Sequence, residues 1–246
     1  PVTSEISGVA YNAGKIYLCN DKIIPNASPI FSAEFDINSL EIKKSFEYYM
    51  LDKIINSEKF EDISISPDKK FVLITTAFDR IYDDTNKFDS FNKLIYLPNK
   101  PLKNLNNDDI QIIEESDNNG IKSSKILRKS LKTALKDSYY PDGPPYFKIE
   151  GLTILPKNKI LFGIREYGNT YTDFKYTIKL LIVGYHFEKQ MFVLDDDIKL
   201  LYTLDTSKLS EVNNRALGIS GLAYNPNNDL LAVLTSLIGI CCPSVI

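Results

Sequence analysis

Four carboxylates stand at positions where they could meet and do chemistry. Each lies in or just ahead of one of several similar short segments, and the set is Glu5, Glu61, Asp62 and Glu150. Carboxylates that converge can hold Ca²⁺, which takes about six to eight oxygen ligands, or share a proton and act as general acid and base. We therefore expect these four residues to be ligands of a Ca²⁺ ion. The alternative is that each acidic side chain caps backbone N–H groups of neighbouring strands and holds the fold together.

Arg165 and Glu166 add a second kind of candidate. The chain has only four arginines, so an arginine close to the acidic segments is not part of a general basic background. Its planar guanidinium can bind phosphate or carboxylate through two parallel hydrogen bonds. We expect a small or anionic ligand to be surrounded by Glu61, Glu150, Arg165 and Glu166. The alternative is an Arg–Glu pair within one sheet.

The composition excludes several classes of active site and partner. The single histidine, His186, leaves no multi-histidine metal site and removes the usual base of a serine triad. Three cysteines without a CxxC spacing argue against a zinc site and against a dense disulfide framework. A net charge of −3 gives no general attraction to nucleic acid, and no apolar run reaches the roughly 18 residues of a membrane span. We expect neither a nucleic-acid partner nor a membrane span.

A short pattern occurs four times and explains why the candidate residues should meet. Its copies read SGVAYNA from Ser7, EDISISP from Glu61, EGLTILP from Glu150 and SGLAYNP from Ser220. The columns are Ser or Glu, then Gly or Asp, then an aliphatic residue and a small residue. A polar turn and a second apolar run follow each copy, which is the pattern of a β-hairpin.

The repeat predicts an all-β, propeller-like fold of one domain over residues 1–246, with units starting near residues 5, 60, 148 and 218. Further strand-like runs lie between the hairpins, at Ile30–Ile37, Lys93–Leu97, Ile110–Glu114, Ile178–His186, Met191–Leu194 and Lys199–Leu204. Two more strands per unit give four-stranded antiparallel blades, whose first strands line a central channel. The first residue of each copy should then lie near one channel mouth. The fourth unit has only two strands before Ile246, so we expect a propeller that is incomplete at its C-terminus; a β-sandwich is the alternative.

Residues 122–137 form the one predicted helix, within an insertion over about residues 120–138. Leu127, Leu131, Ala134 and Leu135 recur at helical spacing on one face, and Ser123 or Ser124 can cap its start. The other positions are strongly basic, with Lys122, Lys125, Arg128, Lys129, Lys132 and Lys136. Such a helix can meet an anionic membrane or an acidic protein partner, or lie over the sheets with its lysines in water.

Three segments resemble phytase-like propeller families. FKIEGLT at 147–153 and ILFGIRE at 160–166 resemble the "EGL…GLR" signature of these families, which include the domain known as esterase-like activity of phytase. SEISGVAY at 4–11 resembles their "SEISGLAY" opening. The resemblance implies a propeller that is extracellular or periplasmic, and in the distant phytases calcium-dependent phosphoester hydrolysis. We expect a ligand-binding domain, with a calcium-dependent phosphoester hydrolase or a non-catalytic interaction scaffold as alternatives.

Overall fold

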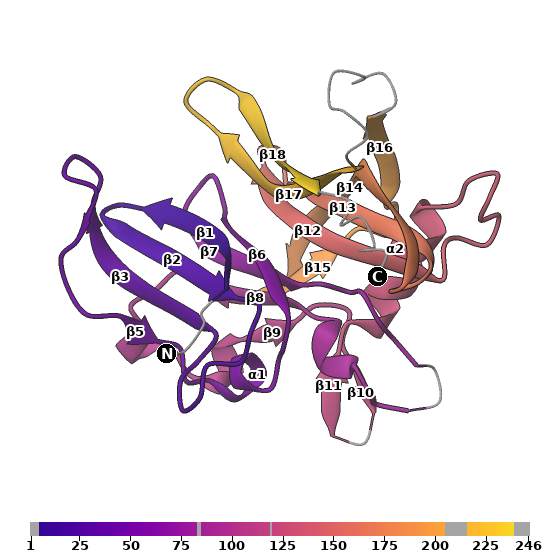
Figure 1. The fold of residues 1–246 in the computed structure, drawn as a ribbon. Helices are drawn as coiled ribbons and strands as arrows, with labels where there is room; N and C mark the ends of the chain where they lie inside the picture. Colours follow the sequence, from indigo (N-terminus) through magenta and orange to yellow (C-terminus); the bar gives the residue numbers. More distant parts are fainter. Residues whose placement is uncertain (1–4, 83–84, 119, 205–215, 239–246) are drawn as a thin grey trace, which may run out of the picture.

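The strands form antiparallel sheets that follow one another along the chain (Figure 1). The computed structural model describes residues 5–82, 85–118, 120–204 and 216–238. Sheet one contains β1 (Ile6–Asn12), β2 (Lys15–Asn20), β3 (Ile30–Asp36), β4 (Glu41–Ile42) and β5 (Glu47–Tyr48). Sheet two contains β6 (Phe60–Ile65), β7 (Phe71–Thr76), β8 (Leu94–Pro98) and β9 (Gln111–Ile112).

The second half of the chain builds two more sheets. Sheet three contains β12 (Tyr146–Leu155), β13 (Lys159–Thr170), β14 (Asp173–Glu188), β15 (Met191–Leu194) and β16 (Lys199–Leu204). Sheet four contains β17 (Ala216–Asn225) and β18 (Leu230–Ile238). The predicted all-β class and the hairpin at each repeat copy are confirmed. Cys241 and Cys242 lie outside the described residues.

Helices and a small hairpin fill the connections. The helices are α1 (Asp52–Ile55), α2 (Lys125–Ala134) and the 3₁₀ turns Asp89–Phe91, Leu102–Asn104 and Asn107–Asp109, and the hairpin pairs β10 (Ser116–Asn118) with β11 (Ile121–Ser123). Among the described residues, no helix is long and apolar enough to cross a membrane.

The predicted amphipathic helix is confirmed, with corrected bounds. It begins three residues later than expected because Ile121–Ser123 pair as a strand. Ser124 does not cap it with its side chain, because its hydroxyl donates to Ile113 O and accepts from the Leu94 N–H at 3.1 Å. Arg128 is buried, with its guanidinium 4.5 Å from the Phe147 ring centre, so the basic positions are not all exposed.

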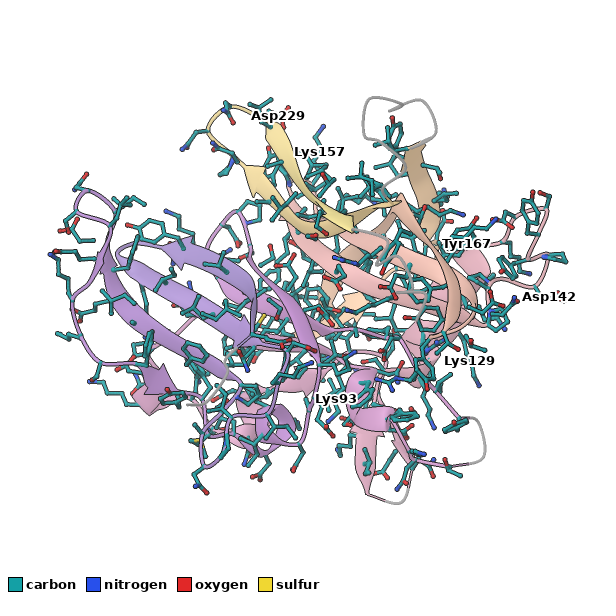
Figure 2. The ribbon with its side chains drawn as sticks, in the orientation of Figure 1. Lys93, Lys129, Asp142, Lys157, Tyr167 and Asp229 are labelled. Carbon is teal, nitrogen blue, oxygen red and sulfur yellow. The ribbon has the colours of Figure 1, made fainter. Side chains whose placement is uncertain are left out.

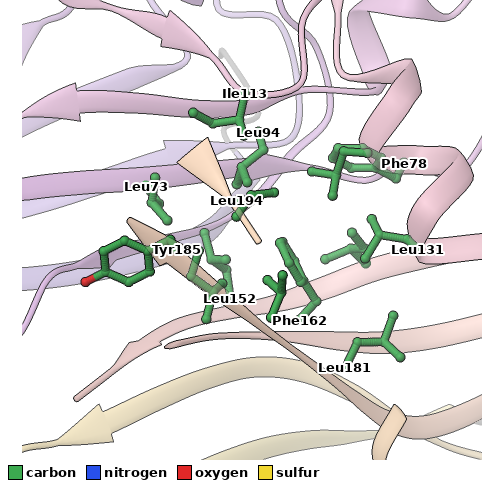
Figure 3. Close-up of a cluster of buried hydrophobic side chains, with 14 of the residues drawn as sticks. Leu73, Phe78, Leu94, Ile113, Leu131, Leu152, Phe162, Leu181, Tyr185 and Leu194 are labelled. Carbon is green, nitrogen blue, oxygen red and sulfur yellow. The ribbon is translucent and has the colours of Figure 1, made fainter. Parts of the chain in front are cut away.

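The core lies between successive sheets. One cluster joins sheet two, sheet three and the apolar face of α2, and Figure 3 shows Leu73, Leu131 and Phe162 among its members. A second cluster joins sheets one and two, and a third joins sheets three and four. Sheets two and three are therefore covered on both faces. This explains why every residue of β7 is buried and why its sequence, FVLITT, shows no apolar–polar alternation.

The first strands of the sheets are neighbours in chain order. β1 contacts β6, β6 contacts β12, and β12 contacts β17. The approach of β1 to β6 depends on Gly8, because a Cβ atom there would lie 2.7 Å from Asp62 Cα. Gly8 and Asp62 occupy the same column of the repeat, so a glycine in one copy makes room for the aspartate of the next.

Replacing Gly8 by alanine should lower the free energy of unfolding by about 1–3 kcal/mol, the usual cost of overpacking. Gly221 is the matched control, because it holds the same repeat column and a Cβ there would have its nearest neighbour at 3.8 Å. Gly221→Ala should change stability by less than about 0.5 kcal/mol. Urea denaturation of both variants measures the difference, and equal effects would contradict the close packing of β1 on β6.

Candidate functional site

Each copy of the repeat begins at a β-bulge. The pairing of β1 with β2 passes from Ile6 to Gly8 and skips Ser7. The corresponding pairings skip Glu61 in β6, Glu150 in β12 and Ser220 in β17. A bulge leaves its extra residue outside the regular ladder and re-aims its side chain. The first column of the repeat is thus a column of bulge residues, namely Ser7, Glu61, Glu150 and Ser220.

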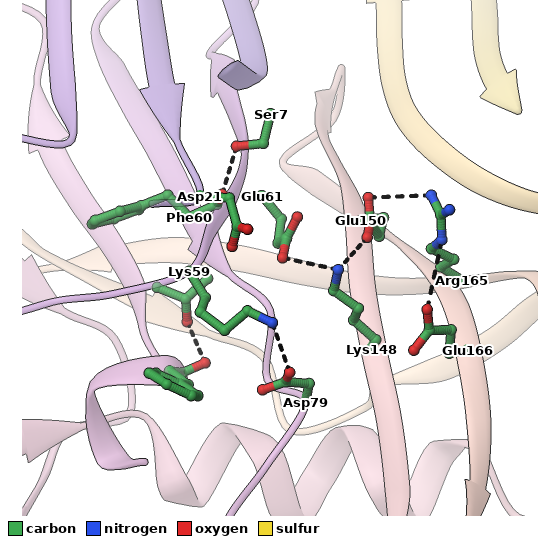
Figure 4. Close-up of polar contacts among 12 residues, drawn as sticks. Ser7, Asp21, Lys59, Phe60, Glu61, Asp79, Lys148, Glu150, Arg165 and Glu166 are labelled. Carbon is green, nitrogen blue, oxygen red and sulfur yellow. Dashed lines mark hydrogen bonds and ion pairs between the residues drawn. The ribbon is translucent and has the colours of Figure 1, made fainter. Parts of the chain in front are cut away.

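A lysine joins the bulge residues of sheets two and three (Figure 4). Lys148 Nζ lies 3.1 Å from Glu61 Oε1 and donates a hydrogen bond to Glu150. On the other side of Glu61, the Ser7 hydroxyl donates to the carbonyl of Phe60. Glu61 and Glu150 therefore do converge on one point, as the repeat predicts, and the ammonium group of Lys148 occupies that point.

Arg165 continues these contacts into sheet four. Its Nη1 lies 3.5 Å from Glu150 Oε2 and donates to Ser220 Oγ at 3.1 Å and to the carbonyl of Ile219 at 3.3 Å. Its Nε lies 3.7 Å from Glu166 Oε1. The polar contacts thus run through all four sheets, and we call Glu61, Lys148, Glu150, Arg165 and Glu166 the bulge network.

Burial controls the charge of the bulge network. Glu61 is only 3% exposed, and this burial raises its pKa to about 8, against the opposing attraction of Lys148. Nearby Glu150 and Asp21 raise the pKa of Glu61 further. Burial alone would lower the pKa of Lys148, but Glu61 and Glu150 outweigh it and hold the pKa above its usual value. Glu61 therefore keeps its proton to a higher pH than an exposed glutamate does.

Asp62 serves the fold rather than the bulge network. Its Oδ2 accepts the backbone N–H of Leu152 at 2.7 Å and that of Leu222 at 3.4 Å, and its Oδ1 accepts that of Ile63 at 2.8 Å. Burial raises its pKa to about 7, although these hydrogen bonds act in the opposite direction. The side chain of Asp62 in sheet two thereby accepts hydrogen bonds from backbone N–H groups of sheets three and four. For Asp62 this is the capping role that the sequence left open as the alternative to calcium binding.

Side-chain hydroxyl groups accept hydrogen bonds from other backbone N–H groups at the edges of the first strands. Ser64 Oγ accepts the N–H of Ile154 at 3.1 Å, and Thr153 Oγ1 accepts that of Tyr224 at 3.2 Å. Ser64 and Thr153 hold the small-residue column of the repeat. That column therefore supplies hydrogen bonds between sheets whose first strands do not pair through their backbones.

The expected calcium ligands do not form a shared oxygen cage. Glu5 is exposed and lies 3.4 Å from Lys22, Asp62 faces backbone donors, and Glu61 and Glu150 face Lys148. Within the described ranges, no group of three or more His, Cys, Asp or Glu side chains is placed to hold a metal ion. This arrangement does not fit a hard cation that takes about six to eight oxygen ligands. Calcium binding stays a prediction of the sequence.

Lys148 and Tyr146 are the members of this site that sequence reasoning missed. Tyr146 hydrogen-bonds through its hydroxyl to Glu166, and Lys148 pairs directly opposite Glu166 in the ladder. The spacing of Tyr146, Lys148 and Glu150 could have revealed both residues. In a regular strand, residues two positions apart point to the same face of the sheet. No family model matches the sequence, and no curated protein matches it.

Proposed function

We propose that the chain is a ligand-binding domain of open, propeller-like architecture, and that its ligand binds at the bulge network. The propeller reading is supported by four sheets in chain order, by neighbouring first strands, and by core clusters between successive sheets. The resemblance to phytase-like propellers agrees with this order. Export from the cytoplasm stays a prediction of that resemblance.

The observation that carries the proposal is the bulge at the same repeat position in all four first strands. Bulges recur next to active sites because they direct side chains away from the ladder. Here they gather ionisable groups from different sheets at one place. The side chains of Lys148 and Arg165 are 15% and 16% exposed, while the carboxylates that orient them are equally or more deeply buried.

The ligand class follows from this arrangement. Cations held in place by buried carboxylates are preorganised to donate hydrogen bonds, so they favour a small molecule with a phosphate or carboxylate group. The partly exposed carboxylate of Glu150 can accept hydrogen bonds from hydroxyl groups of the same molecule. A small polar anion that also carries hydroxyls is therefore the proposed ligand.

Thermal melting with inorganic phosphate and with citrate tests the proposal. Either anion at about 100 times its Kd should stabilise the wild type by roughly 2.7 kcal/mol, and so raise Tm by about 5–10 °C. Arg165→Gln should abolish this rise. Lys15→Gln should keep it, because Lys15 forms an exposed surface pair with Glu47. A Tm unmoved by both anions would leave the bulge network with a structural role only.

The same protein samples distinguish ligand binding from calcium-dependent phosphoester hydrolysis. If the chain were a calcium-dependent phosphoester hydrolase, Ca²⁺ would raise Tm and the protein would turn over p-nitrophenyl phosphate. We expect neither, because Lys148 already neutralises the carboxylates at the convergence point. Ca²⁺-dependent turnover that is lost in Glu150→Gln would replace the binding proposal with the hydrolase.

A further inference from the structure

A cavity of about 660 Å³ lies beside the outer strand of sheet two, away from the bulge network. Its walls come from α1, the 3₁₀ turn Asp89–Phe91, β9 and the β10–β11 hairpin. The lining mixes apolar side chains, such as Ile55 and Ile112, with Glu58, Ser90 and Lys93. A volume of this size is typical of sites for small organic molecules.

Lys93 is unusual among the lysines of the chain. Its side chain is 2% exposed, and its Nζ donates to the carbonyl of Asn56 at 2.6 Å. Within the part of the chain that the structure describes, this ammonium forms no ion pair with a carboxylate. Buried lysines are rarely left without one. Lys148 shows the contrast, since it is also shielded from solvent but has two carboxylates beside it.

The backbone of Lys93 is fixed. Its N–H donates to Thr76 Oγ1 at 2.8 Å, and its carbonyl accepts the N–H of Thr76 at 3.0 Å. Figure 2 shows Lys93 between α1 and the β10–β11 hairpin, the two elements that flank the cavity. The hydrogen bond from Nζ to the carbonyl of Asn56 then holds the side chain at the cavity wall.

Glu58 and Ser90 form a second fixed pair in the same wall. The Ser90 hydroxyl donates to Glu58 Oε1 at 2.9 Å, and the Glu58 N–H donates to the carbonyl of Ser90 at 3.1 Å. The cavity thus holds an amine, a carboxyl group and a hydroxyl group. This is the set needed for nucleophilic attack on a carbonyl carbon with proton transfer.

We propose that Lys93 is a nucleophile that captures a small aldehyde or ketone in this cavity as an imine. The amine nitrogen attacks the carbonyl carbon, so the N–C bond forms while the C–O π bond breaks. Glu58, acting through one bridging water, takes the proton from nitrogen and returns it to oxygen, and the resulting carbinolamine loses water to give the imine. No oxidant or reductant takes part, and the products are the imine and one water molecule.

The electrostatics of the wall agree with this role. Burial lowers the pKa of Lys93 to about 8, against the opposing effect of Glu58, Asp89 and Glu115. Lys53 and Lys122 are the other cations of the lining. At pH 8 about half of the Lys93 amine is then neutral, roughly 100 times the neutral fraction of an ordinary lysine with a pKa near 10.4.

Reductive trapping tests the proposal on the folded wild-type protein. Butanal and sodium cyanoborohydride at pH 8 convert each imine into a stable secondary amine, which peptide mass mapping assigns to a residue. Over short reaction times Lys93 should be alkylated at least about tenfold faster than exposed Lys129, because far more of its amine is neutral. Lys148 should stay unmodified because the neighbouring Glu61 and Glu150 side chains hold its pKa above the usual value of a lysine.

Two variants complete the test. Glu58→Gln should slow alkylation of Lys93 by at least about tenfold, the lower end of what general acid–base catalysis contributes, and leave the rate at Lys129 unchanged. An equal rate at Lys93 would remove Glu58 from the reaction. Lys93→Met should lose the fast site and keep the slow surface labelling. Wild-type protein in which Lys93 is unmodified, or no faster than Lys129, would overturn the proposal.

Discussion

Lys148→Met should lower the free energy of unfolding by about 1–3 kcal/mol, the usual cost of leaving a buried polar group without its hydrogen-bond partner. Lys148 is the cation that Glu61 and Glu150 share, and both carboxyl groups are shielded from water. Without it, Glu150 keeps only Arg165 at 3.5 Å, and Glu61 keeps no cation among the described residues. Urea denaturation at pH 7 gives the value.

A surface pair of similar geometry provides the control for Lys148. Lys15 Nζ lies 2.7 Å from Glu47, with side chains that are 25% and 56% exposed. Lys15→Met should therefore cost no more than about 1 kcal/mol. Combining Lys148→Met with Glu61→Leu should recover part of the loss, because the stranded carboxyl group is removed as well. Similar effects of Lys148→Met and Lys15→Met would show that the bulge network is not buried.

The folded protein should become less stable as the pH rises from 5 to 8. Burial raises the pKa of Glu61 to about 8 and that of Asp62 to about 7, from ordinary values of 4.5 and 3.8. In this range the unfolded chain has released protons that the folded chain still holds, so the free energy of unfolding falls as the pH rises. We expect Tm to fall by about 5 °C or more, since each kcal/mol shifts Tm by about 2–4 °C at this size.

Glu114, whose pKa burial also raises, acts in the same sense, and the remaining groups with shifted pKa values act outside this window. Exposed carboxyl groups with lowered pKa values, such as Asp36 and Asp109, affect stability below about pH 4. Above pH 8 the lowered pKa of Lys93 makes the free energy of unfolding rise with pH, because the unfolded chain then binds more protons than the folded chain. Glu61→Gln should therefore make the decline between pH 5 and 8 shallower, with the part due to Asp62 remaining, and Glu47→Gln should leave it unchanged. A wild-type Tm that rises across this range would contradict the buried, protonated state of Glu61.

The elements of the fold were more predictable than the chemistry of the site. β15 and β16 have the predicted bounds because short apolar runs between turn residues specify a strand locally. The apolar face of α2 was predicted because its apolar residues recur at helical spacing. By contrast, the strand at Ile121–Ser123 could not be inferred, since its pairing with Ser116–Asn118 has no marked apolar alternation.

Lys148 shows why the site itself was harder to predict. The chain contains 25 lysines, so one more beside a glutamate is weak evidence of a role. What distinguishes Lys148 is the bulge that turns Glu150 toward it and the approach of Glu61 from another sheet. Asp62 carried a clearer signal, because it is the one acidic residue in a repeat column where the other three copies have glycine.

The contacts of Asp62 also bear on the order in which the chain assembles. Each sheet is made from one continuous stretch of sequence and can form from contacts that are close along the chain. Asp62 instead binds donors that are 90 and 160 residues away. Contacts of such long range form slowly, because the intervening chain must first be ordered. We expect these contacts to form in the last stage of folding. Substitutions of Asp62 should therefore change the unfolding rate more than the folding rate.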